Sequence, residues 1–141
     1  MDHIVYLDKK AKELEKLISG EKTMIVRGAA GRKLPYGRVE SGEKLFFTVN
    51  NGSGKIYGEG ITGSIINSDK LTKEESAELI NKNMDKLNLT PAQIKRWSGK
   101  RYLILIEIKD FQEIDSFNFD KAEFSNMDDW LIVEDIEKAR I

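Results

Sequence analysis

The sequence is organised around a turn and a strand that read Gly20-Glu21-Lys22-Thr23-Met24-Ile25-Val26-Arg27. From Thr23 to Arg27 the side chains alternate in a largely apolar and β-branched run, which is typical of a strand. Strict alternation would place Lys22 and Arg27 on opposite faces of this strand. The two cations can therefore share one cleft only if Lys22 belongs to the turn.

An amphipathic helix is predicted before the turn, over about Lys9–Ser19, with Asp8 as its N-cap. Gly20 is placed to end this helix in a left-handed conformation. A short strand, His3–Leu7, is predicted before the helix. After the strand ending at Arg27 comes a glycine-rich loop that carries three cations and one aromatic residue: Arg32, Lys33, Tyr36 and Arg38.

Two further strands are predicted at Lys44–Asn50 and Lys55–Ile66, joined by the turn residues of Asn50–Gly54. The second strand contains glycines at short intervals, and such glycines indicate bends or bulges that let a small sheet curl into a barrel: Gly58, Gly60 and Gly63.

Capping boxes at Thr72 and Thr90 predict two helices, the first ending near Asn88 and the second stopping at Gly99. The almost continuously apolar segment Arg101–Lys109 predicts a central strand covered on both faces that closes the barrel. An edge strand is predicted at Trp130–Val133 and a last helical turn within residues 134–141.

The spacing of Gly20, Lys22 and Arg27 fits the pattern G-x-K-x-x-x-x-R, with a helix before it and strands after it. Over residues 3–110 this resembles the ASCH family of the PUA-like β-barrels. The resemblance implies an α+β fold, a small mixed β-barrel with flanking helices. It also implies a cleft beside the barrel that binds RNA or nucleotide-like ligands.

Some bacterial members of that family hydrolyse acetylated cytidine with the motif lysine, a threonine two residues before the motif arginine, and a glutamate on a later helix. The matching lysine is Lys22, whereas the threonine position holds Ile25, which has no hydroxyl; Thr23 lies next to the lysine. Lys22 is the candidate catalytic base, and the candidate carboxylate partners are Glu59, Glu74, Glu75 and Glu78.

The predicted ligand-binding set combines the motif with the basic loop, because arginines grip phosphates bidentately and an aromatic face can stack a base. It consists of Gly20, Lys22, Thr23, Arg27, Arg32, Lys33, Tyr36 and Arg38. The lone histidine, His3, is interpreted as a structural or an exposed residue rather than a catalyst, and Trp97 and Trp130 are interpreted as core residues.

The absence of cysteine and the single histidine exclude disulfides, thiolate metal sites and imidazole-rich metal sites, and no cofactor is predicted. The pair Asp128 and Asp129 is interpreted as a solvated part of an acidic segment rather than a metal site. No apolar run approaches a membrane-spanning length, so a cytoplasmic protein is expected.

One domain is expected over residues 1–141, with an acidic C-terminal extension over about 111–141. Residues 1–109 carry 20 Lys and Arg against 14 Asp and Glu, whereas residues 110–141 carry 3 against 10. Aromatic residues in the extension, among them Phe119, Phe124 and Trp130, predict that it packs on the body.

Three hypotheses follow from these residues. The first is RNA or nucleotide binding in the basic cleft, and the alternative is a small hydrolase that acts on a modified nucleoside or RNA with Lys22 as base. A third is an interaction domain whose acidic extension meets a basic partner. The extension could also screen the basic cleft.

Overall fold

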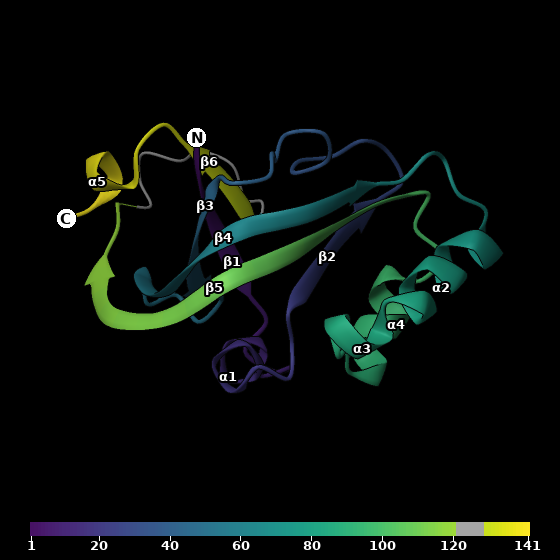
Figure 1. The fold of residues 1–141 in the computed structure, drawn as a ribbon, viewed down its shortest axis with the longest axis horizontal. Helices are drawn as coiled ribbons and strands as arrows, with labels where there is room; N and C mark the ends of the chain where they lie inside the picture. Colours follow the sequence, from purple (N-terminus) through teal and green to yellow (C-terminus); the bar gives the residue numbers. More distant parts are fainter. Residues whose placement is uncertain (121–128) are drawn as a thin grey trace.

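The computed structural model of the chain describes residues 1–120 and 129–141 and builds them into a mixed sheet with five helices (Figure 1). The strands are β1 (Asp2–Leu7), β2 (Met24–Ala29), β3 (Lys44–Val49), β4 (Lys55–Asn67), β5 (Tyr102–Asn118) and β6 (Trp130–Val133). The helices are α1 (Glu13–Ser19), α2 (Lys73–Lys82), α3 (Met84–Leu87), α4 (Pro91–Trp97) and α5 (Ile136–Ala139).

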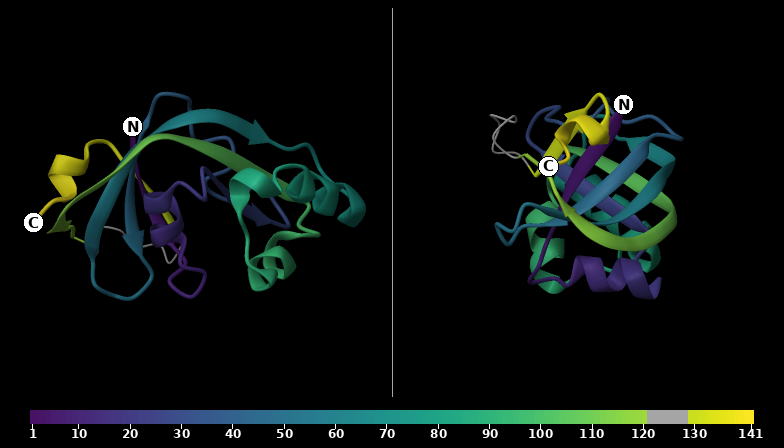
Figure 2. Two further views of the ribbon diagram at one scale, coloured as in Figure 1. Left: turned by 60° about the horizontal axis from the view of Figure 1, so that its bottom comes forward. Right: turned by 90° about the vertical axis from the view of Figure 1, so that its left-hand side faces the viewer.

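The six strands form one sheet in the order β2-β5-β4-β3-β1-β6. Strand β1 runs parallel to β3, and the other four pairings are antiparallel. The sheet curls around a common core as a half-barrel, with β2 and β6 at its edges (Figure 2). The predicted α+β class with a curled mixed sheet is confirmed.

Glycines in β4 allow the long paired strands β4 and β5 to lie close together. The pairing of these strands shifts register three times, and a Cβ atom at Gly60 would lie 2.9 Å from Ile108 Cγ2. At Gly58 it would lie 2.8 Å from the ring of Phe111. The bulges predicted from the glycine spacing are therefore confirmed.

The apolar core has three parts. The concave side of the half-barrel buries residues such as Ile25, Phe47 and Ile106 together with Leu17 of α1. The side of β2 and β5 that carries Met24 and Leu105 packs against α2, α3 and α4, and a third cluster lies beside α5. Helices α2–α4 and helix α5 thus lie at opposite ends of the sheet (Figure 1).

The prediction of the first helix was wrong at its start. Asp8 does not cap it; the Oδ1 atom of Asp8 accepts a hydrogen bond from the Ala11 amide and closes a turn instead. Lys12 is left-handed (φ 56°), so that the regular helix begins at Glu13. The end was predicted correctly, because Gly20 is left-handed (φ 83°).

Both capping boxes are confirmed at Thr72 and Thr90. The helix after Thr72 is nevertheless split at Asn83, whose side-chain amide donates to the Leu79 carbonyl. An asparagine side chain that bonds to the backbone competes with helix continuation.

No helix in residues 1–120 or 129–141 is long and apolar enough to cross a membrane.

The strand predicted at Arg101–Lys109 is present and is covered on both faces, but its predicted length and its predicted central position in the sheet were wrong. Strand β5 continues to Asn118 and lies between β2 and β4, second from one edge of the sheet. Its second half belongs to the predicted acidic extension, and Phe119 and Trp130 are buried as expected. The edge strand β6 is confirmed, whereas Phe124 and Asp128 lie outside the described residues.

His3 links the N-terminal strand to the edge strand. Its Nδ1 atom accepts a hydrogen bond from the Trp130 indole at 3.0 Å, and its Nε2 atom lies 2.9 Å from Glu43 Oε1. The ring is completely buried, and both nitrogens are used within the fold. The structural interpretation of His3 is therefore confirmed.

Candidate functional site

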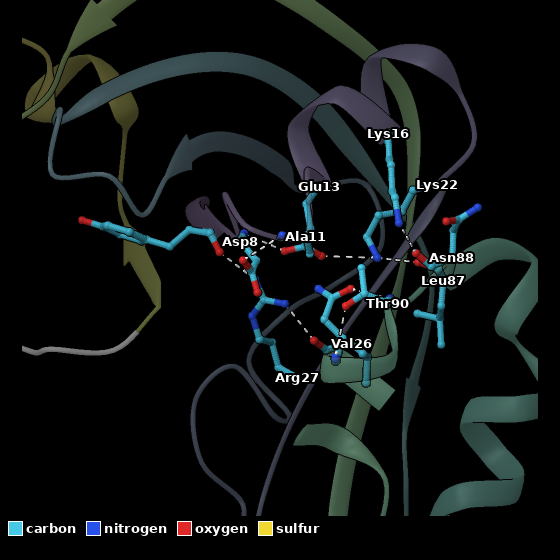
Figure 3. A network of polar contacts seen from close by, with 12 residues as sticks. Asp8, Ala11, Glu13, Lys16, Lys22, Val26, Arg27, Leu87, Asn88 and Thr90 are labelled. Atoms are coloured by element: carbon cyan, nitrogen blue, oxygen red, sulfur yellow. Dashed lines mark hydrogen bonds and ion pairs between the residues drawn. The ribbon is translucent and has the colours of Figure 1, made fainter. Parts of the chain in front are cut away.

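The turn after α1 directs Lys22 inward. Gly20 ends the helix, and the amide of Lys22 donates to the Lys16 carbonyl, so Lys22 precedes the ladder of β2 as the shared-cleft hypothesis required. Lys22 is buried, and as a whole residue it is 1% exposed. Its Nζ atom donates to the Leu87 carbonyl and lies 3.3 Å from Glu13 Oε2 (Figure 3).

Glu13 is the carboxylate partner of Lys22, and the sequence interpretation missed it. Its side chain is buried at the start of α1, and Oε1 accepts a hydrogen bond from the Asp8 amide at 2.8 Å. The available signal was its position four residues before the buried Leu17, on the same helix face. The carboxylates that were predicted instead lie elsewhere: Glu59 on β4 and Glu74, Glu75 and Glu78 on α2.

Burial and mutual attraction set the protonation of this pair. Burial lowers the pKa of Lys22 to about 8, even though the Glu13 carboxylate opposes the shift. Burial raises the pKa of Glu13, but the charges of Arg27 and Lys22, together with hydrogen bonds from the Asp8 amide and from Lys22, hold that pKa below its usual value. At neutral pH the pair is therefore an ion pair closed off from water.

Arg27 bridges the open side of the half-barrel. Its Nη1 atom donates to the Val26 carbonyl on β2 and its Nη2 atom to the Tyr6 carbonyl on β1, each at 2.8 Å. These two strands are not neighbours in the sheet. The Nε atom lies 3.2 Å from Asp129 Oδ2, yet it is buried without a hydrogen-bond partner in the described chain.

Two hollows, of about 80 and 130 Å³, meet at Arg27 and share the lining residues Arg96, Trp97 and Asp129. Pockets that bury a drug-sized ligand measure about 300–1,000 Å³. Each hollow is therefore large enough for a small group such as a phosphate but not for a whole nucleotide. The acids Asp8 and Glu13 line the first hollow, so that with Asp129 its acids outnumber its two arginines, whereas the cations Lys33 and Lys100 line the second.

Two guanidinium groups lie over the indole ring of Trp97. The Cζ atom of Arg96 lies 4.4 Å from the centroid of the indole ring, and that of Arg27 lies 5.9 Å from it. Such contacts are favourable because the ring face is negative. The core role predicted for Trp97 is confirmed by its burial, while its contact with both arginines also places it at the hollows.

The predicted ligand-binding set does not converge on one place. Lys22 lies behind Glu13 and lines neither hollow, whereas Arg27 lines both and Lys33 lines the second. Gly20 and Thr23 line neither; the Thr23 amide donates to the Lys86 carbonyl and supports α3.

The rest of the basic loop lies apart from these hollows. Arg32 stacks on Tyr36 and Tyr102, with its Cζ atom 6.0 and 5.6 Å from their ring centroids. The Tyr36 hydroxyl donates to the Ser68 carbonyl. Arg38 lines a different hollow, next to Glu40 and Glu43.

Three charged residues of the second hollow were not anticipated as ligand contacts: Arg96, Lys100 and Asp129. They come from α4, from the loop after it and from the residue before β6, so only the folded chain brings them to Arg27. Over residues 1–120 and 129–141, no group of three or more His, Cys, Asp or Glu side chains is arranged to hold a metal ion.

No protein-family model and no curated protein matches the sequence. Among solved structures, the ASCH protein from Zymomonas mobilis is similar at a TM-score of 0.71 and 16% identity, over 97% of this chain and 90% of that chain. Its tyrosine-to-phenylalanine mutant has a TM-score of 0.72 and its serine-to-alanine mutant 0.69, each at 16% identity over 97% of this chain. They are covered over 93% and 91% of their lengths. The chain therefore has the fold of these ASCH proteins, and the predicted fold class is confirmed.

Proposed function

We propose that this protein binds RNA or a nucleotide-like ligand through phosphate contacts beside Arg27, chiefly in the second of the two hollows. One observation carries the proposal: Arg27 is 6% exposed and lines both hollows, and its buried Nε donor has no hydrogen bond within the described chain, although the Asp129 carboxylate lies 3.2 Å away. Buried donors without partners are rare and costly. A phosphate oxygen in the hollow would supply the missing acceptor.

The charge around the second hollow supports an anionic ligand. Arg27, Lys33, Arg96 and Lys100 line the second hollow, against one acidic residue of the described chain, Asp129. Arg96 is 57% exposed and lies over Trp97, so the outer face of its guanidinium plane is available for a stacked base. The arrangement combines phosphate contacts with a stacking surface, as single-stranded RNA requires.

The family resemblance supports the same ligand class, because the cleft expected in that family lies beside the motif strand. In this proposal Arg27 and Lys33 keep the roles predicted for them, and Arg96 and Lys100 join them. Lys22 acts indirectly, by holding Glu13 against the turn. Arg32, Tyr36 and Arg38 would serve only a longer ligand that extends beyond the hollows.

Fluorescence anisotropy of a labelled oligouridylate over a series of salt concentrations tests the proposal. We expect Arg96→Gln and Lys100→Gln each to weaken binding and to reduce the slope of log affinity against log salt by about 0.7, because each removes one phosphate contact to a single strand. Arg140→Gln, which removes an exposed cation beside α5, is the matched control. An affinity that does not change with salt concentration, or an equal loss of affinity in all three variants, would contradict the proposal.

A second candidate function, hydrolysis of a modified nucleoside or RNA with Lys22 as base, has one observation in its favour. The pKa of Lys22, lowered to about 8 chiefly by burial, makes it a better base at neutral pH than an ordinary lysine. Against this, its Nζ atom lies behind Glu13. A screen of acylated nucleosides and RNA with Lys22→Met distinguishes the two functions, since turnover lost in that variant supports the hydrolase and binding without turnover supports the first proposal.

A further inference from the structure

Asp129 places a carboxylate over the cations of the hollows. Its Oδ2 atom lies 3.2 Å from Arg27 Nε and 3.9 Å from Arg96 Nη2. It lines both hollows and is the one acid of the described chain that lines the second. The negative charge therefore stands where the proposed function requires a phosphate oxygen.

The contact between Asp129 and Arg27 is an ion pair without a hydrogen bond. The Nε donor of Arg27 is buried and unsatisfied although the carboxylate is nearby. An oxyanion aligned with this N–H would gain a charge-assisted hydrogen bond that Asp129 does not make. A ligand phosphate can thus replace the carboxylate with a net gain in hydrogen bonding.

The backbone of Asp129 is held by the fold, while its side chain is partly exposed. Its carbonyl accepts a hydrogen bond from the Tyr6 amide at 3.0 Å, and the next residue, Trp130, is completely buried against His3. The Asp129 side chain is 38% exposed. The inference below therefore requires a rotation about the side-chain bonds of Asp129 rather than a movement of the β6 backbone.

We propose that Asp129 is an internal competitor that occupies the anion site between Arg27 and Arg96 and must be displaced when an RNA phosphate binds. This inference rests on the proposed function and adds a regulatory element to it. The acidic extension was expected to screen the basic cleft, and this inference assigns that role to the carboxylate of Asp129. Affinity in this protein is then set by the difference between an external phosphate and this internal anion.

The test is binding of the labelled oligouridylate to the full chain with Asp129→Asn, Asp129→Glu and Asp115→Asn. We expect Asp129→Asn to bind at least about fivefold more tightly, a typical effect of removing a coupled competitor. Asp129→Glu keeps the charge and should bind like the wild type. Asp115→Asn removes the same charge from an exposed position on the far half of β5 and should change affinity little.

The outcomes separate this inference from the function on which it depends. If the wild type binds and loses affinity with Arg96→Gln, but Asp129→Asn binds no more tightly than Asp115→Asn, the competitor is refuted and the function stands. If neither the wild type nor Asp129→Asn binds at low salt, both proposals fail. Asp129→Ser, which also removes the carboxylate, replaces the asparagine variant if thermal melting shows that the latter is unfolded.

Discussion

The ammonium group of Lys22 lies 3.3 Å from the carboxylate of Glu13, and the two side chains are 0% and 3% exposed. The pair joins the start of α1 to the turn before β2, and the second bond of Lys22, to the Leu87 carbonyl, extends this link to α3. Three elements that position the hollows therefore meet at one buried ion pair (Figure 3).

Removing one partner of this pair should destabilise the fold. We expect Glu13→Gln to lower the free energy of unfolding by about 3–5 kcal/mol, because it leaves the buried ammonium without its counter-charge. Urea denaturation measures the effect. Glu15→Gln, which changes an exposed acid on the same helix, should stay within about 0.5 kcal/mol of the wild type.

A double variant isolates the cause. Replacing the pair by Glu13→Leu with Lys22→Met should recover most of the stability lost in Glu13→Gln, since well-packed apolar side chains often replace buried ion pairs without net cost. A double variant as unstable as the single one would show that packing at the turn, rather than the unpaired charge, determines the loss.

The pKa of Lys22 predicts how stability depends on pH. Its pKa falls from 10.5 in the unfolded chain to about 8 in the folded protein, so between these values the unfolded chain binds more protons. Stability should therefore rise with pH from about 8 to about 10.5. Comparing the urea midpoints of wild type and Lys22→Met over this range removes the contributions of other groups. A difference that stays constant with pH would contradict the prediction.

Gly28 on β2 allows close contact with β5. A Cβ atom there would lie 2.6 Å from Leu103 Cδ2 and 3.0 Å from the Tyr102 carbonyl oxygen. We expect Gly28→Ala to destabilise the protein by about 1–3 kcal/mol through overpacking. Gly31→Ala is the matched control, because nothing lies within 4 Å of its Cβ position. Equal midpoints for both variants in thermal melting would refute the close contact.

The hydrogen bond from Trp130 to His3 holds the edge strand β6 against β1. His3→Phe keeps an aromatic ring but removes the acceptor, leaving a buried indole N–H without a partner. We expect a loss of about 1–3 kcal/mol. Urea denaturation followed by tryptophan fluorescence measures this loss. The comparison is with Trp130→Phe introduced into the His3→Phe variant. If the two changes are additive rather than partly redundant, the hydrogen bond is not the source of the loss.

Local features of the fold were largely predictable from the sequence. The capping boxes at Thr72 and Thr90, the left-handed end at Gly20 and the apolar alternation of β2 depend on neighbouring residues, whose chemistry acts over one or two turns. The start of α1 and the split at Asn83 were not predicted, because each depends on side chains that bond to the backbone instead of continuing a helix.

The composition of the hollows was less predictable. The motif indicated Arg27, and the loop indicated Lys33, but the partners Arg96, Lys100 and Asp129 follow from how α4 and the segment before β6 approach β2. Glu13 was hidden for a related reason, since an acid next to an apolar stripe is usually exposed. Its burial depends on a lysine that reaches it from the turn.

The sequence by itself determined the capping boxes at Thr72 and Thr90, the end of α1 at Gly20, the strand periodicity and the cationic motif, because each is encoded in residues a few positions apart. Only the tertiary structure decided that Lys22 turns inward to Glu13 while Arg27 reaches the surface hollows and faces Asp129. The physical reason is that buried charges must find partners, and in this fold those partners come from distant segments of the chain.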